Sequence, residues 1–387
     1  MWISRLSLTN FRNYRHLELK PPPHLVVIQG DNAQGKTNLL EAIHVVATTR
    51  SHRGSDDREL IHQGASQDGL PFARLFAQVE RDRGNIEVEI ALRLERKEPP
   101  SSAEAQPFSA RKRIRVNGIA RRAVDLVGQI NVVMFGAQDI DLVAGAPSLC
   151  RRYLDIVNSQ TDPRYLRSLQ RYHRVLVQRN HLLKLLQGHQ AQHEQLEFWN
   201  SELVESGSYL IMQRQRLVAA LNELAQQVHR KLSGSLEQLR IVYIPSVGKE
   251  GQTSEIESQF HQTLRQLRGK EVSQGMTLAG PHRDSLRFEA NEADMGRYGS
   301  RGQQCTVALS LKLAEAKYMH TKVGDHPILL LDDVLTELDR SRRQHLLEFI
   351  TPLQQVLITA TDLDRFDPSF LNQAAQFRVK QGNIERA

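Results

Sequence analysis

Residues 30–37 limit what this chain can fold into more than any other stretch of the sequence. They run GDNAQGKT and match the pattern G-x-x-x-x-G-K-[ST]. The apolar run 24–29 before them predicts a buried strand, and the apolar spacing of Leu39, Leu40 and Ile43 after them predicts a helix. Strand, glycine-rich loop and helix in this order form a phosphate-binding loop, because backbone N–H groups and the positive end of the helix dipole converge on one anion. A glycine turn beside a stray lysine is the alternative, which the flanking strand and helix disfavour.

This loop predicts a nucleotide site in which two side chains have defined roles. We expect Lys36 to neutralise the β- and γ-phosphates and the Thr37 hydroxyl to hold Mg²⁺. The predicted nucleotide-binding residues of the loop are Gly30, Asp31, Asn32, Ala33, Gln34, Gly35, Lys36 and Thr37.

Residues 328–333, with the sequence ILLLDD, form an apolar run that ends in two carboxylates. This is the pattern of a buried strand in a parallel sheet, whose carboxyl end carries ligand-facing side chains. We expect Asp332 to hold Mg²⁺ opposite Thr37, and Asp333 to orient an attacking water. Asp333 and Lys36 are therefore the predicted catalytic residues. A strand that merely ends in a polar turn is the alternative, and it leaves the loop without a metal partner.

A second helix start lies at Ser300, which is flanked by glycines and followed by apolar residues at helical spacing. Serine is a favoured residue at a helix N-terminus, where free N–H groups attract anions. One chain already has a phosphate-binding loop, so a second anion site suggests that Ser300 of one copy contacts the γ-phosphate held by another. A well-capped helix with no ligand is the alternative, and the Ser300 segment taken alone favours it.

The charge balance of the chain permits a polyanionic partner without requiring one. Lys and Arg number 51 against 44 Asp and Glu, which gives a net charge of +7 and a sequence pI near 9.5. The densest basic cluster falls on a hairpin predicted by Asn117-Gly118, and its DNA-contact candidates are Arg111, Lys112, Arg113 and Arg115. A charged edge that discourages strand pairing remains an equal alternative. Residues 99–107 before this hairpin have the composition of an exposed loop.

The middle of the chain predicts a helical insertion between two halves of an α/β core. From residue 151 to about 233 leucines recur at helical spacing, and polar residues 187–195 interrupt them, so we expect two long antiparallel helices. Strand patterning returns at residues 241–244 and 277–288. The predicted division is 1–140 and 266–387 for the core halves and 141–265 for the helical lobe.

The two cysteines show no zinc-ligand spacing, and no apolar segment approaches the length of a membrane span. The N-terminal residues also have no apolar core of an export signal. We therefore expect a soluble, cytoplasmic protein.

Taken together, these motifs resemble the ABC-type ATPase heads of the SMC and Rad50 group. The resemblance narrows to the RecF family of bacterial DNA replication and repair proteins, because several further motifs are similar along nearly the whole chain. They are residues 6–14, 50–53, 58–61, 151–155 and 280–284, with Ser-Arg-Gly-Gln at 300–303 as the signature motif. Only a short helical hairpin fits between residues 151 and 233, whereas SMC and Rad50 proteins carry coiled coils of hundreds of residues.

The RecF resemblance implies an α/β fold, an ABC-type P-loop ATPase head with a mixed or parallel sheet and an inserted lobe like a short antiparallel coiled coil. It implies ATP and Mg²⁺ as cofactors, an ATP-dependent homodimer on DNA, and slow hydrolysis to ADP and phosphate that releases the dimer. The implied partners are RecR and RecO, which with this protein promote RecA loading at single-strand gaps. No base-reading motif is evident, so we expect recognition of DNA structure rather than of sequence.

The resemblance also implies roles for residues outside the phosphate loop. Ser300, Gly302 and Gln303 would contact nucleotide across the dimer, Asp339 would lie in the loop at the dimer interface, and Gln138 would sense Mg²⁺ or the γ-phosphate. Two departures favour slow turnover: Asp333 stands where most ABC ATPases have Glu, and residues 358–361 have no switch histidine. A small-molecule kinase and a transporter ATPase head are the other classes that a P-loop permits. A kinase needs no signature motif, and the helical insertion does not fit a transporter head.

Overall fold

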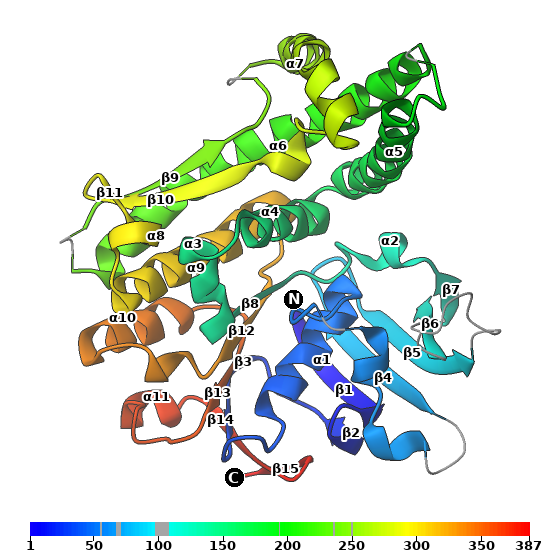
Figure 1. The fold of residues 1–387 in the computed structure, drawn as a ribbon. Helices are drawn as coiled ribbons and strands as arrows, with labels where there is room; N and C mark the ends of the chain where they lie inside the picture. The colour runs from blue at the N-terminus through cyan, green and yellow to red at the C-terminus, as the bar shows by residue number, and fades with distance from the viewer. Residues whose placement is uncertain (55, 67–70, 97–107, 193, 235–236, 249–250) are drawn as a thin grey trace. The chain divides into compact units, whose positions relative to one another are not determined.

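The computed structural model describes residues 1–54, 56–66, 71–96, 108–192, 194–234, 237–248 and 251–387 (Figure 1). The chain divides into two compact units, unit 1 with Met1–Asp139 and Glu315–Ala387, and unit 2 with Ile140–Ala314. Helix α9 (Arg301–Val323) begins in unit 2 and ends in unit 1. The division at residues 140 and 265 made from the sequence stays a prediction, and the loop predicted at 99–107 lies outside the described residues.

Unit 1 contains a six-stranded sheet in the order β15-β14-β3-β13-β12-β8. All of its pairings are parallel except that of the edge strand β15 with β14. The strands that surround the phosphate loop are continuous apolar runs, as expected where both faces of a sheet are covered. Their bounds are β3 His24–Gln29, β8 Val132–Gly136, β12 Ile328–Asp332, β13 Gln355–Ala360, β14 Ala375–Lys380 and β15 Asn383–Arg386.

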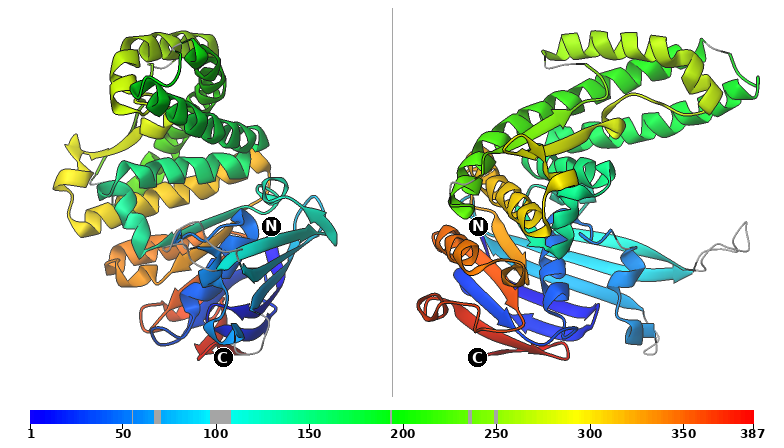
Figure 2. Two further views of the ribbon diagram at one scale, coloured as in Figure 1. Left: turned by 45° about the vertical axis from the view of Figure 1, so that its right-hand side comes forward. Right: turned by 60° about the vertical axis from the view of Figure 1, so that its left-hand side comes forward.

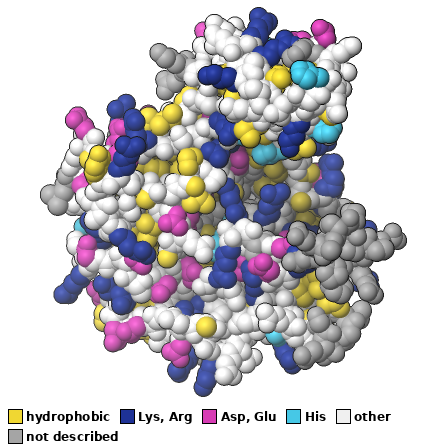
Figure 3. All heavy atoms as spheres, viewed as in Figure 1, with side chains coloured by type: hydrophobic (Ala, Val, Ile, Leu, Met, Phe, Trp, Pro, Cys, Tyr) yellow, Lys and Arg dark blue, Asp and Glu magenta, His cyan; other side chains and the backbone are white. Residues whose placement is uncertain are grey.

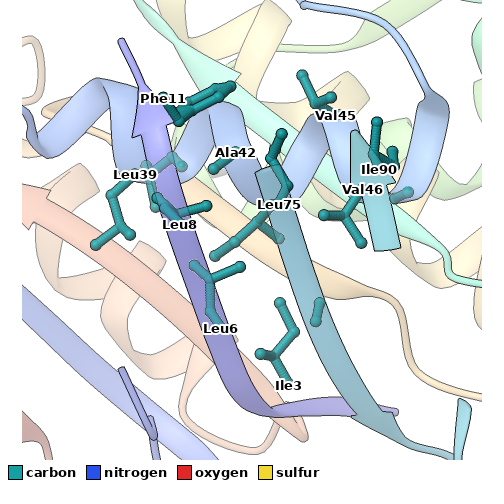
Figure 4. Packing of buried hydrophobic residues seen from close by; sticks show 14 of the residues in the cluster. Ile3, Leu6, Leu8, Phe11, Leu39, Ala42, Val45, Val46, Leu75 and Ile90 are labelled. Atoms are coloured by element: carbon teal, nitrogen blue, oxygen red, sulfur yellow. The ribbon is translucent and has the colours of Figure 1, made fainter. Parts of the chain in front are cut away.

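The second sheet of unit 1 is antiparallel, in the order β2-β1-β4-β5-β6-β7. Its strands alternate buried and more exposed residues, which is the pattern of a sheet with one covered face. Figure 4 shows how Leu6 and Leu8 of β1 and Leu75 of β4 gather with Leu39 and Val46 of α1. The bounds are β1 Trp2–Phe11, β2 Tyr14–Leu19, β4 Phe72–Glu80, β5 Ile86–Arg96, β6 Phe108–Val116 and β7 Ile119–Arg121.

Helix α1 (Lys36–Thr48) packs against strands of both sheets. Most of its residues are buried, including polar ones such as Glu41 and His44, because the antiparallel sheet covers one side and the parallel sheet another. The helix that begins at the phosphate loop is therefore the central element of the unit 1 core.

The predicted hairpin at Asn117-Gly118 is confirmed. Both residues have positive φ, 49° and 78°, as a two-residue type I′ turn requires, and they join β6 to β7.

Unit 2 is mostly helical, and α5 and α6 run alongside each other in it (Figure 2). The prediction of two long helices separated at residues 187–195 is confirmed by α5 and α6. Its start at residue 151 is wrong, because that residue lies in a separate helix, α4, which ends at Thr161 before α5 begins at Pro163. Proline is well suited to the first turn of a helix, and Asp162 caps α5 by accepting from Arg164 N at 2.8 Å. The helices are α3 Asp141–Ala144, α4 Pro147–Thr161, α5 Pro163–Gln187, α6 Gln195–Leu232, α7 Thr253–Gln274 and α8 Met295–Tyr298.

A small sheet of order β11-β10-β9 completes unit 2. The strand expected over 277–288 is shorter than predicted, because Gly280, at φ 130°, and a 3-10 turn at Pro281–Arg283 precede β10. The bounds are β9 Leu239–Ile244, β10 Ser285–Ala290 and β11 Ala293–Asp294.

Three further helices of unit 1 are α2 Ala123–Leu126, α10 Arg340–Ile350 and α11 Pro368–Leu371. On the face in Figure 3, Lys and Arg side chains are interspersed with Asp and Glu. No helix in the part of the chain that the structure describes combines the length and the apolar composition needed to cross a membrane.

Candidate functional site

The phosphate loop joins the carboxyl end of β3 to the first turn of α1 in unit 1. Its start is fixed by Gly30 N, which donates to Ala360 O at 3.2 Å, and its end by the Tyr14 hydroxyl, which donates to Gly35 O at 2.9 Å. Gly35 has φ 117°, and a Cβ there would lie 2.5 Å from Asn13 Nδ2. Only glycine fits this position, so the loop conformation depends on a residue that the motif requires.

The middle of the loop is exposed to solvent, while hydrogen bonds to the Gln34 carbonyl hold its backbone. Asp31, Asn32 and Ala33 are exposed, and Ala33 has a left-handed φ of 63°. Gln34 O accepts from Asn13 Nδ2 at 2.9 Å and from Gly382 N at 3.2 Å. The loop is thus tied to the β1–β2 turn and to the turn after β14.

Lys36 is only 7% exposed, and its Nζ donates to Gly30 O at 2.6 Å and to Asp31 O at 2.8 Å. Burial lowers the pKa of Lys36, and the nearby carboxylates of Asp333 and Asp332 oppose this shift only in part. A cation held by carbonyl oxygens inside its own loop is placed to accept an anion there.

Thr37 and Asp332 lie together, as the sequence predicts. Thr37 Oγ1 donates to Asp332 Oδ1 at 3.0 Å, and Thr359 Oγ1 donates to the same oxygen at 2.7 Å. The contact arises because β12 pairs in parallel with β13, with Asp332 opposite Thr359, so the strand ends meet at one edge. The hydroxyl and the carboxylate are oxygen ligands of the kind that Mg²⁺ prefers.

Asp333 leaves the strand instead of continuing it. Its φ of 52° is left-handed, and its backbone N–H donates to Thr359 Oγ1 at 3.0 Å. Burial raises the pKa of Asp333, and the charge of Asp332 adds to this, while Lys36 acts in the opposite direction. A carboxylate with a raised pKa at the edge of a phosphate site is suited to accept a proton or a hydrogen bond from water.

The oxygens of Thr37 and Asp332 could coordinate a cation that is also coordinated by a bound phosphate. In the described residues, no group of three or more His, Cys, Asp and Glu side chains is placed to hold a metal by itself. Thr37 and Asp332 would supply protein oxygens, and the oxygens of a bound phosphate would supply others.

Two residues carried over from the resemblance also lie in unit 1. Gln138 is exposed, two residues beyond Gly136, which pairs with Asp332 across β8 and β12. Asp339 caps α10, because its Oδ1 accepts from Arg342 N at 2.9 Å. Gln138 therefore follows the same sheet edge as the phosphate loop, and Asp339 has a local structural role.

An ion pair anchors α1 to the hairpin turn between β1 and β2. Arg12 donates to both carboxylate oxygens of Glu41, at 2.9 and 2.8 Å, and Ser51 Oγ donates to Glu41 Oε1 at 2.5 Å. Burial by itself would raise the pKa of Glu41, which is 0% exposed, but the Arg12 and Ser51 hydrogen bonds outweigh it and the pKa is lowered. The carboxylate is therefore charged and fully paired.

The signature motif lies in unit 2, at the start of α9. Ser300 Oγ accepts from Gln303 N at 3.3 Å, and Gln303 Oε1 accepts from Ser300 N at 3.0 Å. This reciprocal pair is a capping box, in which Ser300 precedes the helix and Gln303 is its third residue. The Gln303 amide also donates to Glu237 Oε1 at 2.8 Å. Gly302 lies within the first turn of the helix between them.

The basic hairpin in unit 1 divides into two faces. Arg111, Arg113 and Arg115 alternate on the exposed face of β6, whereas Lys112 points to the other face. Lys112 Nζ donates to Asp57 Oδ1 at 2.9 Å and to Thr49 O at 2.6 Å, so its charge is engaged within the unit.

Three residues that shape the site lie in segments named in the sequence analysis, but the motifs there assign none of them a role in the site. Thr359 holds Asp332 and Asp333 in place, and Asn13 and Tyr14 hold the phosphate loop. Thr359 follows the apolar run of β13, as Asp332 follows that of β12, and this parallel was the signal that could have found it.

The chain matches the family model described as "RecF/RecN/SMC N terminal domain" over residues 2–383. The "DNA replication and repair protein RecF" of Herpetosiphon aurantiacus is 48% identical over 389 residues, which cover 99% of each chain. The protein of the same name from Halalkalibacterium halodurans is 40% identical over 389 residues, which cover 100% of each chain.

Two solved structures are also similar. The "Structure of the recombination mediator protein RecF-ATP in RecFOR pathway" has a TM-score of 0.87 at 28% identity, with 100% of this chain and 97% of that chain covered. The "Crystal structure of the SmcHead bound to the C-winged helix domain of ScpA" shares the fold, with a TM-score of 0.54 at 14% identity over 100% and 97% of the two chains. The predicted fold class, an α/β ABC-type ATPase head with a helical insertion, is confirmed. Because the chain matches this family model and also matches RecF relatives over nearly its full length, it belongs to the RecF family.

Proposed function

We propose that this chain is an ATP-dependent DNA-binding protein of replication and repair, in which nucleotide binding closes a homodimer and slow hydrolysis opens it. The observation that carries the proposal is the meeting of Lys36, Thr37 and Asp332 at one sheet edge, with Thr37 Oγ1 3.0 Å from Asp332 Oδ1. Its family relatives support it, because the similar solved structure is named as RecF with ATP.

The residues of unit 1 would bind and hydrolyse the nucleotide. Lys36 exchanges its carbonyl partners for the β- and γ-phosphates, and Thr37 and Asp332 hold the Mg²⁺ that accompanies them. Asp333 accepts a hydrogen bond from water and orients it for attack on the γ-phosphorus, which gives ADP and phosphate. Aspartate is one methylene shorter than glutamate, which favours a slow reaction suited to a switch.

The residues of the signature motif would complete the site from a second copy of the chain. The Ser300 oxygen accepts within the capping box, so its O–H hydrogen remains a donor for a γ-phosphate oxygen. The positive end of the α9 dipole adds to the attraction for an anion. Asp339 and Gln138 are assigned to the dimer interface and to γ-phosphate sensing on the resemblance alone.

The exposed face of β6 is our candidate DNA contact. Arg111 and Arg115 pair with Glu95 at 3.4 Å and Glu89 at 3.9 Å, but exposed pairs of this length are weak and can be exchanged for phosphate. Arg113 lies between them on the same face. Lys112 is left out of this face, since its ammonium binds Asp57. The contacts would be to the backbone, without base specificity.

The place of this activity in the cell follows the family. We propose that the chain acts in the cytoplasm with RecR and RecO, and promotes RecA loading at single-strand gaps.

A titration of duplex, gapped and single-stranded DNA with ATP, ADP and no nucleotide tests the proposal. We expect retention on DNA only with ATP, and loss of this retention in Lys36→Ala. Ser300→Arg should bind nucleotide as a monomer and fail to dimerise with ATP on size exclusion, because a bulky cation replaces the hydroxyl. Equal DNA binding with and without ATP in the wild type would refute the gating, and ATP-induced dimers of Ser300→Arg would refute the composite site.

A further inference from the structure

A continuous chain of hydrogen bonds leads from the signature motif to a buried histidine within unit 2. Gln303 Nε2 donates to Glu237 Oε1 at 2.8 Å, and Glu237 Oε2 lies 3.0 Å from His229 Nε2. His229 Nδ1 in turn lies 3.0 Å from Ser310 Oγ, on the inner side of α9. His229 is 0% exposed and Glu237 14% exposed, so these contacts are largely shielded from water.

The hydrogen bond between His229 and Glu237 has a fixed direction. A carboxylate only accepts, so His229 Nε2 donates to Glu237 Oε2. Ser310 Oγ, which donates to Thr306 O at 2.7 Å, is the partner of His229 Nδ1. Both ring nitrogens of the buried histidine therefore have a hydrogen-bond partner.

The orientation of the Gln303 amide follows from the same assignment. Its NH₂ group faces Glu237, so its oxygen faces Ser300 N and accepts from it at 3.0 Å. The reversed amide would place an oxygen against the carboxylate and an NH₂ group against the Ser300 N–H, and both contacts would be repulsive. Glu237 and the Ser300 N–H therefore favour the same orientation of the Gln303 amide, and Glu237 holds its NH₂ end.

We propose that Glu237 and His229 are positioning residues of the signature motif, which hold Gln303 so that Ser300 is presented in one geometry. The proposal rests on the proposed function, since it concerns the residue assigned to the partner's γ-phosphate. Neither residue touches the nucleotide in this scheme. Glu237 lies between α6 and β9, and His229 lies in the last turn of α6.

Because His229 lies in the last turn of α6, its hydrogen bonds connect the signature motif at residues 300–303 to that helix. Helix α6 has 38 residues, which corresponds to about 57 Å at 1.5 Å per residue. A shift of the α6 C-terminus would move His229 and Glu237, and the capping of α9 with them. The start of α9 is in this way mechanically coupled to the helical part of unit 2.

Three variants test the inference. Glu237→Ala removes the acceptor for Gln303. Glu237→Gln keeps every contact without charge, because its carbonyl oxygen accepts from Gln303 and its amide donates to a neutral His229. Asn222→Ala is the matched control: Asn222 Oδ1 accepts from Ile241 N at 2.7 Å, so this variant removes an α6–β9 hydrogen bond two helical turns from His229 without touching Gln303.

Two measurements apply to each variant of the full chain. Amide hydrogen exchange without nucleotide reports the capping of residues 300–304 directly, and size exclusion with ATP reports dimerisation. For Glu237→Ala we expect at least tenfold faster exchange at residues 300–304 and at least tenfold weaker ATP-dependent dimerisation, with ADP binding by the monomer unchanged. Glu237→Gln should stay within about threefold of wild type in both measurements, as charge-free hydrogen bonds replace the original ones.

The inference is overturned if Glu237→Ala exchanges and dimerises as wild type does. It is also overturned if Glu237→Gln fails as Glu237→Ala does, or if Asn222→Ala weakens dimerisation equally. Faster exchange in Glu237→Ala alone, together with a wild type that does not dimerise with ATP, would support the positioning role and refute the proposed function instead.

Discussion

Replacing Arg12 by alanine tests the ion pair that anchors the nucleotide-loop helix. Glu41 is 0% exposed and Arg12 14% exposed, and two hydrogen bonds of 2.9 and 2.8 Å join them. Removing one partner of a buried pair costs about 3–5 kcal/mol because the other charge stays buried. We take about 3 kcal/mol, the lower end of that range, since Ser51 continues to donate to Glu41. In a domain of this size this corresponds to a loss of roughly 6–12 °C in Tm.

The pH dependence of this loss identifies its cause. In the wild type the pKa of Glu41 is lowered below 4.5, so the pair stabilises the fold above this pH and the stabilisation is lost as the pH falls through the lowered pKa. Without Arg12, burial raises the pKa of Glu41 and the carboxyl takes up a proton more readily. The difference in Tm between wild type and Arg12→Ala should be largest at pH 8 and should narrow as the pH falls toward 4.5, through the raised pKa of Glu41 in the variant.

Thermal unfolding followed by circular dichroism from pH 8 to pH 4.5 measures this difference. Arg5→Ala is the control, because the Arg5–Glu18 pair of 3.1 Å lies in the same sheet but is 45% and 40% exposed. Such a surface pair is worth roughly 0–1 kcal/mol. A loss in Arg12→Ala that is the same at pH 8 and pH 4.5, or no larger than that of Arg5→Ala, would refute the reasoning.

Two further predictions concern Asp333 and the basic face of β6. Asp333→Asn should raise Tm at neutral pH, because burial raises the pKa of Asp333 and makes its ionised form unfavourable. This gain should shrink as the pH falls through the raised pKa and should be absent below 3.8. ATP hydrolysis should drop about hundredfold or more, and an unchanged hydrolysis rate would remove Asp333 from catalysis. Replacing Arg111, Arg113 and Arg115 together by alanine should make the affinity for DNA less sensitive to salt. The negative slope of log affinity against log salt concentration should become shallower by about 0.9 for each DNA phosphate that the variant no longer neutralises. The triple variant Arg265→Ala, Arg268→Ala and Lys270→Ala, on α7, removes the same charge elsewhere, and equal effects in the two triples would point to net charge alone.

The parts of the site that the sequence predicts are those encoded locally. The phosphate loop and the Asn117-Gly118 turn depend on φ values that few residues allow, so their residue types reveal them. The strand that ends at Asp332 is an uninterrupted apolar run, which is the pattern of a strand covered on both faces. These segments lie where expected.

The remaining contacts depend on which strands and helices meet. Thr359 approaches Asp332 because β12 and β13 are neighbours in the sheet, and sequence patterns do not give strand order. Glu237 meets Gln303 from a segment 66 residues earlier in the chain. Helix α7 is a different case, since Ile256, Phe260 and Leu264 at a spacing of four were a readable signal that was overlooked.

The strand order has a consequence for the synthesis of the protein. Strand β3, which carries the phosphate loop, pairs on one side with β13 and on the other with β14, and these strands begin at Gln355 and Ala375. Until a ribosome has released these residues, β3 has neither neighbour. A nascent chain that ends before β13 and β14 therefore lacks the supported loop, and we expect it to bind no nucleotide until both strands have been made.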